Sequence, residues 1–240
     1  MQPYLSVIIP AYNEGERITR TLLDIDAYLS KKTFSYEIIV VNDGSRDTTA
    51  ELVRNHEKVV KYSRLIDNKE NKGKGAAVRQ GMLEAKGEYC LFTDADNSTS
   101  IDQIERLLPF FREGYNVVIG SRAVKGSIIP VPQPWIRRVL GHIGNGIIQI
   151  LVLPGIHDTQ CGFKLFSAEA ARDIFSRLTV YRWGFDIEAL VIARVLHHNI
   201  KEVGITWVND IHSHVSSSAY VQVLLETLRV RWNMWMKRYR

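Results

Sequence analysis

Cysteine is scarce in this sequence, with Cys90 and Cys161 as the only two among 240 residues. Two cysteines are too few for a disulfide framework, and their spacing fits no metal-binding motif. We therefore expect two buried, reduced thiols in a cytoplasmic protein. The first residues also lack the basic leader, apolar core and cleavage site of an export signal, which agrees with this expectation.

Long apolar runs are missing too. The longest apolar stretch covers residues 143–156 and is interrupted by Gly144, Asn145, Gly146, Gln149 and Pro154. A membrane-spanning helix needs about 20 consecutive apolar residues, so this stretch is too short to cross a bilayer. Any membrane contact is therefore predicted to be peripheral.

The rest of the composition is that of a globular protein. Hydrophobic residues make up 45% of the chain and charged residues 24%, which allows a sizeable core. The formal net charge of +5 favours an anionic partner such as nucleic acid, a lipid headgroup or a phosphorylated substrate. Charge alone does not choose among the three.

Short β-branched runs alternate with amphipathic stretches in the first half of the chain. The runs predict strands at residues 5–10, 37–41, 64–66, 89–93 and 117–120. Between the first two, a buried helical stripe is indicated by Ile18, Leu22, Ile25 and Leu29. This alternation predicts an α/β fold with a doubly wound, mostly parallel sheet and helices on both faces.

The second half has a different character. Three prolines between residues 130 and 134 indicate a loop, and a helix is expected at 185–197 before a strand at 203–208. Residues 135–153 and 220–240 combine bulky apolar residues with Lys and Arg. These two stretches predict C-terminal amphipathic interfacial helices, with packing against the α/β core as the alternative.

Polar residues follow three of the predicted strands. Tyr12, Asn13 and Glu14 follow the first strand, Asp43 the second, and Asp94-Ala95-Asp96 the fourth. Ligands of an open parallel sheet bind beyond the carboxyl ends of the strands. One acidic strand end is usually a helix cap or a turn, but three together predict a site.

Asp94 and Asp96 form the most informative pair. Alternate residues of an extended segment point the same way, and two close carboxylates repel each other unless a cation lies between them. Carboxylate oxygens are suitable ligands for Mg²⁺ or Mn²⁺. The pair therefore predicts a metal site, and a solvated turn is the alternative.

Glycines and cations also open a predicted helix in residues 71–79. Exposed backbone N–H groups and the helix dipole favour phosphate at such a helix start, where Lys74 lies. The segment does not match a Walker A loop. The segment either contacts phosphate directly or forms a turn into the helix that glycine permits.

Together these residues resemble the inverting family 2 glycosyltransferases of GT-A type, in particular the dolichyl-phosphate glucosyl- and mannosyltransferase group. The resemblance covers nearly the whole chain. The matching segments, in order, are 7–14, 40–45, 71–75, 94–96, 120–122, 158–164 and 183–188. The segment Asp158-Thr159-Gln160-Cys161-Gly162-Phe163-Lys164 is most similar to the glucosyl branch.

The resemblance implies roles for individual residues. The nucleotide sugar would be held by Pro10, Ala11, Tyr12, Glu14, Asp43, Lys74, Ala95, Arg122 and His214. Asp94 and Asp96 would bind Mg²⁺ or Mn²⁺ with the donor diphosphate, and the acceptor would meet Arg138, Gln160 and Lys164. Residues 1–125 would form the nucleotide-sugar part and residues 126–240 the acceptor part of one continuous catalytic domain.

Two positions depart from the pattern of the family. Ser98 stands where mannosyl relatives often have Gln, and His214 stands where many relatives have a Lys that reaches the donor phosphates. The second difference predicts a phosphate contact that depends on pH.

The implied reaction moves a hexose with inversion to a polyprenyl or dolichyl phosphate, either glucose from UDP-glucose or mannose from GDP-mannose. A phosphate acceptor is already largely dianionic near neutral pH and needs little help from a base. A glycan hydroxyl acceptor, the first alternative, needs a general base, for which Asp186 is the candidate. The other reading of Asp186 is the N-cap of the helix that follows it.

A sugar nucleotidyltransferase is the alternative outside this class of enzyme, and no nucleic-acid partner is expected because the strand ends are acidic. The basic, Trp-rich tail predicts a peripheral protein on the inner, cytoplasmic face of a membrane. Because this tail follows the last strand, we expect its removal after Ser218 to leave nucleotide affinity unchanged.

Overall fold

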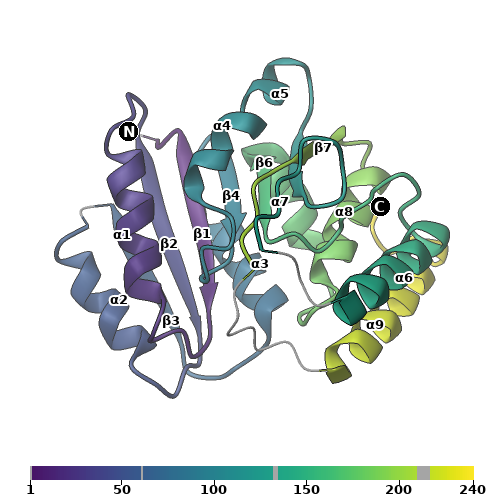
Figure 1. Ribbon diagram of the computed structural model, residues 1–240, viewed down its shortest axis with the longest axis horizontal. Coiled ribbons are helices and arrows are strands. Elements are labelled where there is room, and N and C mark those ends of the chain that lie inside the picture. The colour runs from purple at the N-terminus through teal and green to yellow at the C-terminus, as the bar shows by residue number, and fades with distance from the viewer. Residues whose placement is uncertain (1, 61, 132–134, 210–216) are drawn as a thin grey trace.

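The computed structural model describes residues 2–60, 62–131, 135–209 and 217–240. Side chains are not described for residues 135–138, 140, 142, 217 and 218 within these ranges. Among the described residues, seven strands form one sheet in the order β3-β2-β1-β4-β6-β5-β7 (Figure 1). The strands are β1 Leu5–Ala11, β2 Tyr36–Asp43, β3 Ser63–Asn68, β4 Tyr89–Thr93, β5 Val117–Ser121, β6 Phe163–Ser167 and β7 Ile200–Gly204.

The strand order contains a switch point between β1 and β4. The chain moves outward from β1 to β3 and then returns through β4 to the other side of β1, with all of these pairings parallel. Connections that leave β1 in opposite directions place their helices on opposite faces of the sheet. A crevice therefore forms beyond the carboxyl ends of β1 and β4, where open α/β sheets bind ligands.

Helices cover both faces of the sheet, and each face has its own apolar cluster. The first half contains α1 Ile18–Leu29, α2 Thr49–Glu57, α3 Lys74–Glu84, the 3₁₀ turn η1 Ile101–Gln103, α4 Ile104–Leu107 and α5 Pro109–Arg112. Apolar residues of α1, α2 and α4 pack on one face, and those of α3 pack on the other. The predicted stripe of α1 is buried at every position.

The second half adds α6 Trp135–Leu151, α7 Ala168–Arg177, α8 Phe185–Val195 and α9 Ser217–Trp235. Helices α7, α8 and α9 contribute to the same cluster as α3, and α9 packs against both α6 and α8. Figure 1 shows α6 and α9 lying together at one end of the molecule. No helix of the described ranges is long and apolar enough to cross a membrane.

The sequence pattern missed β6, which pairs antiparallel with both β4 and β5. Because β6 lies between β4 and β5, strands from before and after residue 125 form one sheet. The strand predicted at 203–208 begins and ends earlier in the structure. Strand β7 covers Ile200–Gly204 and pairs parallel with β5. Residues 205–208 instead follow the strand, where Ile128 and Thr206 form an isolated bridge.

Candidate donor and metal site

A pocket of about 500 Å³ lies at the carboxyl ends of β1, β2 and β4. Parallel pairing brings these strand ends to the same edge of the sheet. Nine residues predicted from the sequence line this pocket: Pro10, Ala11, Tyr12, Glu14, Asp43, Lys74, Asp94, Ala95 and Asp96. Tyr12 is 42% exposed, so its side chain is accessible to a ligand in the pocket. The strand ends therefore meet where the sequence predicted.

The two carboxylates after β4 have different surroundings. Asp94 forms an ion pair with Lys74, with 2.6 Å between Oδ1 and Nζ. Oδ1 of Asp96 accepts a hydrogen bond from the backbone N–H of Ser98 at 2.9 Å. Burial, and next the negative charge of Asp94, raise the pKa of Asp96 above its usual range.

This pair fits a divalent cation. Oδ1 of Asp94 is buried and makes no directional hydrogen bond, although the Lys74 ammonium lies beside it. A cation between two carboxylates would remove the repulsion that raises the pKa of Asp96. No cluster of three or more His, Cys, Asp and Glu side chains occurs in the described part of the chain. The remaining ligands of such a cation would be waters and substrate phosphates.

Asp43 is nearly fully buried and organises the start of α3. Its two carboxylate oxygens accept hydrogen bonds from the backbone N–H groups of Lys72 and Gly73, both at 2.9 Å. Burial raises the pKa of Asp43, and the two backbone bonds lower it by less. A nucleoside contact by Asp43 stays a prediction, because the structure shows this carboxylate holding the loop.

Glu14 also lies at the pocket wall. Its carboxylate accepts a hydrogen bond from Nε of Arg17 at 2.8 Å. Burial raises the pKa of Glu14 to about 6, and Asp96 and Asp94 add to this while Arg17 opposes it. The pocket therefore concentrates negative charge around the position where the predicted cation would bind.

Gly73 allows α3 to begin against a neighbouring segment. Its φ is +103°, and a Cβ there would lie 2.4 Å from the carbonyl oxygen of Tyr181. That oxygen accepts a hydrogen bond from the N–H of Ala76 at 3.1 Å. Glycine at this position is required both by the backbone conformation and by the close approach.

Comparison with known proteins identifies the family. The model described as "Glycosyl transferase family 2" matches residues 6–175. Dolichyl-phosphate beta-glucosyltransferase of Dictyostelium discoideum is 38% identical over 242 residues, which cover 95% of this chain and 74% of that protein. The protein of the same name from Homo sapiens is 36% identical over 222 residues, covering 85% and 67%. The chain belongs to glycosyl transferase family 2.

Solved structures show the same fold. Glucosyl-3-phosphoglycerate synthase of Mycobacterium tuberculosis, in complex with Mn²⁺, UDP and glucosyl-3-phosphoglycerate, superimposes with a TM-score of 0.71. The two chains are 20% identical, and the match covers 95% of this chain and 80% of that one. This likeness confirms the GT-A fold of the glycosyltransferase.

Arg122 of this glycosyltransferase follows β5 and does not line the pocket. Its guanidinium binds the buried carboxylate of Asp158 through Nε and Nη2, both at 2.8 Å. It also lies 5.3 Å from the ring centroid of Trp207. Glu202 accepts the backbone N–H of Asp158 at 2.8 Å and so fixes this loop. The predicted phosphate contact of Arg122 stays a prediction.

The structure corrects the expectations for Asp186 and Lys164. Asp186 is not an N-cap, because Gly184 caps α8 and Asp186 lies inside its first turn. The Lys164 side chain is 1% exposed, and its ammonium binds Oδ1 of Asp186 and the carbonyl oxygen of Cys161, both at 2.5 Å. Lys164 therefore has no open face toward an acceptor here. Burial raises the pKa of Asp186, and the ammonium of Lys164 opposes this rise.

The other acceptor residues are placed less fully. Gln160 is exposed on the loop before β6. The side chain of Arg138 and the whole of His214 lie outside the described residues. Their roles, and that of Asp186 as a base, stay predictions.

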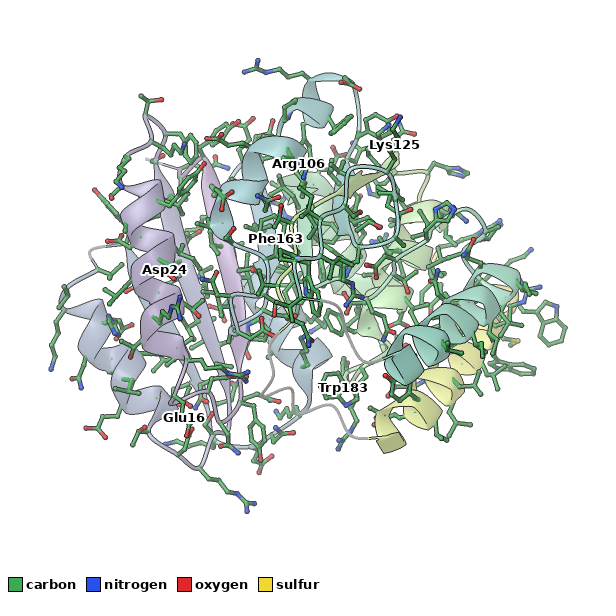
Figure 2. The ribbon with its side chains drawn as sticks, viewed as in Figure 1. Glu16, Asp24, Arg106, Lys125, Phe163 and Trp183 are labelled. Carbon is green, nitrogen blue, oxygen red and sulfur yellow. The ribbon has the colours of Figure 1, made fainter. Side chains whose placement is uncertain are left out.

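Three pocket residues were missed by sequence reasoning: Arg17, Arg182 and Trp183. Arg17 lies in the turn before α1, and the other two precede α8. The ring centroid of Trp183 lies 5.8 Å from Nζ of Lys74. Figure 2 shows Trp183 between α3 and the pair formed by α6 and α9. The only signal for Trp183 was its place at the start of the matching segment 183–188, and Arg182 lies one residue before that segment.

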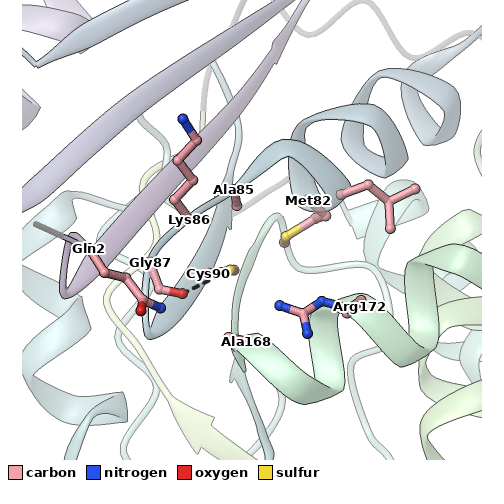
Figure 3. Close-up of a pocket in the computed structure, with 9 residues that line it drawn as sticks. Gln2, Met82, Ala85, Lys86, Gly87, Cys90, Ala168 and Arg172 are labelled. Carbon is pink, nitrogen blue, oxygen red and sulfur yellow. Dashed lines mark hydrogen bonds between the residues drawn. The ribbon is translucent and has the colours of Figure 1, made fainter.

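A smaller pocket of about 80 Å³ lies at the other end of the sheet, near Met82, Cys90 and Arg172 (Figure 3). Burial raises the pKa of the Cys90 thiol to about 12. A buried thiol of this kind is not an effective nucleophile. Both cysteines are buried and free, as expected from the sequence.

Proposed function

We propose that this glycosyltransferase moves glucose from UDP-glucose to a polyprenyl phosphate such as dolichyl phosphate, with inversion. The names of the curated relatives support this acceptor and this sugar. The UDP in the Mycobacterium tuberculosis structure supports the nucleotide. The observation that carries the proposal is a carboxylate-lined donor pocket in a chain that also presents an exposed apolar helix surface.

In this mechanism Asp94 and Asp96 would hold Mg²⁺ or Mn²⁺, and such an ion would supply positive charge for the departing nucleoside diphosphate. Lys74 lines the pocket at the start of α3 beside these carboxylates, and its ammonium would contact the donor phosphates. Tyr12 contributes a ring face for the nucleoside.

The acceptor phosphate acts as its own nucleophile. With a second pKa of about 6, such a phosphate is largely dianionic near pH 7 and needs no general base. The burial of Asp186 against the ammonium of Lys164 agrees with this reading, because that carboxylate is already engaged. A glycan hydroxyl acceptor would instead need a carboxylate free to take a proton.

An apolar surface on α9 supports the membrane as the source of acceptor. Its large apolar side chains face outward along one stripe: Val221, Leu224, Leu225, Leu228, Trp232 and Trp235. Exposed basic residues flank this stripe at 229, 231, 237, 238 and 240. Trp near lipid headgroups and cations near anionic lipid would hold a protein at a bilayer without spanning it. We place the enzyme peripherally on the cytoplasmic face, where its two thiols stay reduced.

The reaction can be tested with the purified full chain. UDP-glucose or GDP-mannose is incubated with Mg²⁺ or Mn²⁺ and polyprenyl phosphate, and the lipid product is identified by mass spectrometry. We expect glucosyl phosphoryl lipid and free UDP from UDP-glucose, and almost no product from an Asp96→Asn variant. Transfer from GDP-mannose alone would overturn the proposed donor. Release of pyrophosphate instead of UDP would indicate a nucleotidyltransferase.

A further inference from the structure

The segment 178–184 forms a wall of the donor pocket and rests on the C-terminal helix. Arg182 and Trp183 line the pocket, and Tyr181 contacts the start of α3. The next residue, Gly184, donates its backbone N–H to Oε2 of Glu226 at 2.6 Å. Glu226 belongs to α9, so a residue of the C-terminal helix binds the N-cap residue of α8 directly after Trp183.

A second contact joins the other end of the segment to the end of the chain. The fully buried carboxylate of Glu188 accepts the backbone N–H groups of Thr179 and Val180, at 2.7 and 2.6 Å. It also accepts the hydroxyl of Tyr239 at 2.7 Å. Tyr239 is 1% exposed, although it is the penultimate residue of the chain.

Side chains under α9 complete this attachment. Asn233 is buried and donates to the hydroxyl oxygens of Thr179 and Tyr239, both at 3.2 Å. Val230 is fully buried in the core cluster that also contains Val180. Both ends of the pocket wall are therefore bonded to residues after 218, whereas the expected separation of tail and donor site assumed no such contacts; nucleotide affinity without the tail stays a prediction.

We propose that Glu226 and Tyr239 are positioning residues of the donor site, which hold Arg182 and Trp183 against a bound nucleoside diphosphate. This assignment rests on the proposed UDP-sugar donor. Neither residue lines the pocket, so each acts through the backbone of the segment 178–184. The C-terminal helix then has an exposed apolar face and, through the partly buried Glu226 and the buried Asn233, polar contacts to the pocket wall.

The test is UDP affinity, measured by calorimetric titration of the full chain with UDP and Mn²⁺ in the absence of membranes. Glu226→Ala removes the acceptor for the Gly184 N–H, and we expect UDP binding to weaken about five- to tenfold. Glu226→Gln keeps an acceptor oxygen and should stay within about twofold of the wild type. Leu225→Ala is the matched control in this membrane-free titration, because Leu225 is the residue before Glu226, is 62% exposed and does not line the pocket, so its UDP affinity should be unchanged.

Steady-state kinetics separate positioning from general stability. In Glu226→Ala the KM for UDP-glucose should rise while the KM for the lipid acceptor stays unchanged, at a temperature well below each variant's Tm. Tyr239→Phe removes a single hydroxyl and tests the second contact if Glu226→Ala does not fold. Wild-type UDP affinity in both Glu226→Ala and Tyr239→Phe would overturn the assignment, as would equal weakening in Leu225→Ala. A wild-type chain that does not bind UDP would instead overturn the proposed donor.

Discussion

Gly162 and Asp94 approach each other so closely that a Cβ at Gly162 would lie 1.9 Å from Oδ2 of Asp94. The antiparallel pairing of β6 with β4 brings them together, since Thr93 lies opposite Phe163. The backbone N–H of Asp94 donates to the carbonyl oxygen of Gly162 at 3.2 Å. The missing side chain at Gly162 therefore sets where the first predicted metal ligand can lie.

Gly162→Ala should displace the Asp94 carboxylate and lower kcat about 100-fold, because shifts of about 1 Å in a catalytic site have effects of this size. Mn²⁺ affinity, measured by titration with UDP present, should fall as well. Gly146→Ala in α6 is the control, because no atom lies within 4 Å of its added Cβ. A Gly162→Ala enzyme with wild-type kcat and metal affinity would refute this role of Gly162.

Glu14 should make the stability of the metal-free protein depend on pH. Its pKa is about 6 in the folded chain, above an ordinary value of about 4.5, mainly because it is buried. As the pH falls from 7 to 5, Glu14 is protonated in the folded chain at a higher pH than in the unfolded chain. Its contribution to the free energy of unfolding therefore rises by about 1 kcal/mol. Urea unfolding of the wild type and of Glu14→Gln at both pH values measures this contribution. The effects of other titrating groups cancel when the two proteins are subtracted. Parallel pH profiles for the two proteins would contradict it.

Removing only one charge of the buried pair of Lys164 and Asp186 should strongly destabilise the fold. Asp186→Asn leaves a buried ammonium without its carboxylate, and we expect the free energy of unfolding to fall by about 3 kcal/mol. Lys164→Met with Asp186→Asn should recover most of this loss, as measured by urea unfolding.

The same double variant separates the two acceptor hypotheses. A phosphate acceptor needs no base, so a stable double variant should keep measurable glucosyl transfer at saturating donor. A stably folded double variant that binds UDP but has lost several orders of magnitude in kcat would favour a hydroxyl acceptor activated by Asp186.

The exposed rings on α9 should carry vesicle binding. Trp232 and Trp235 pack against each other with centroids 5.0 Å apart and are 53% and 71% exposed. Trp232→Ala with Trp235→Ala should strongly reduce co-sedimentation with vesicles that contain anionic lipid, while Tm and UDP affinity change little. High salt should weaken binding of the wild type, because each Lys or Arg contributes about 1 kcal/mol through a screened field. Failure of the wild-type chain to co-sediment with such vesicles at low salt would contradict the proposed membrane binding.

Much of the donor half could be predicted because its signals are local. The apolar runs of β1 and β4 fixed the strand ends at Ala11 and Thr93 to within one residue, and parallel pairing then had to bring Tyr12 near Asp94. β6 escaped prediction because Phe163–Ser167 is short and contains Lys164, whose burial depends on a partner 22 residues away. Arg182 and Trp183 were not predicted as pocket residues, because they follow no predicted strand and only Trp183 lies in a segment that resembles the family.

The sequence by itself determined the alternation of strands and helices, the carboxylates at the strand ends and the apolar stripe of α9, because each follows from residues close together in the chain. Only the tertiary structure decided what each polar side chain contacts. Asp186 pairs with Lys164 instead of capping α8, Arg122 binds Asp158, and Glu226 holds the pocket wall. These contacts join distant segments, and burial leaves each charge only the partner that the fold supplies.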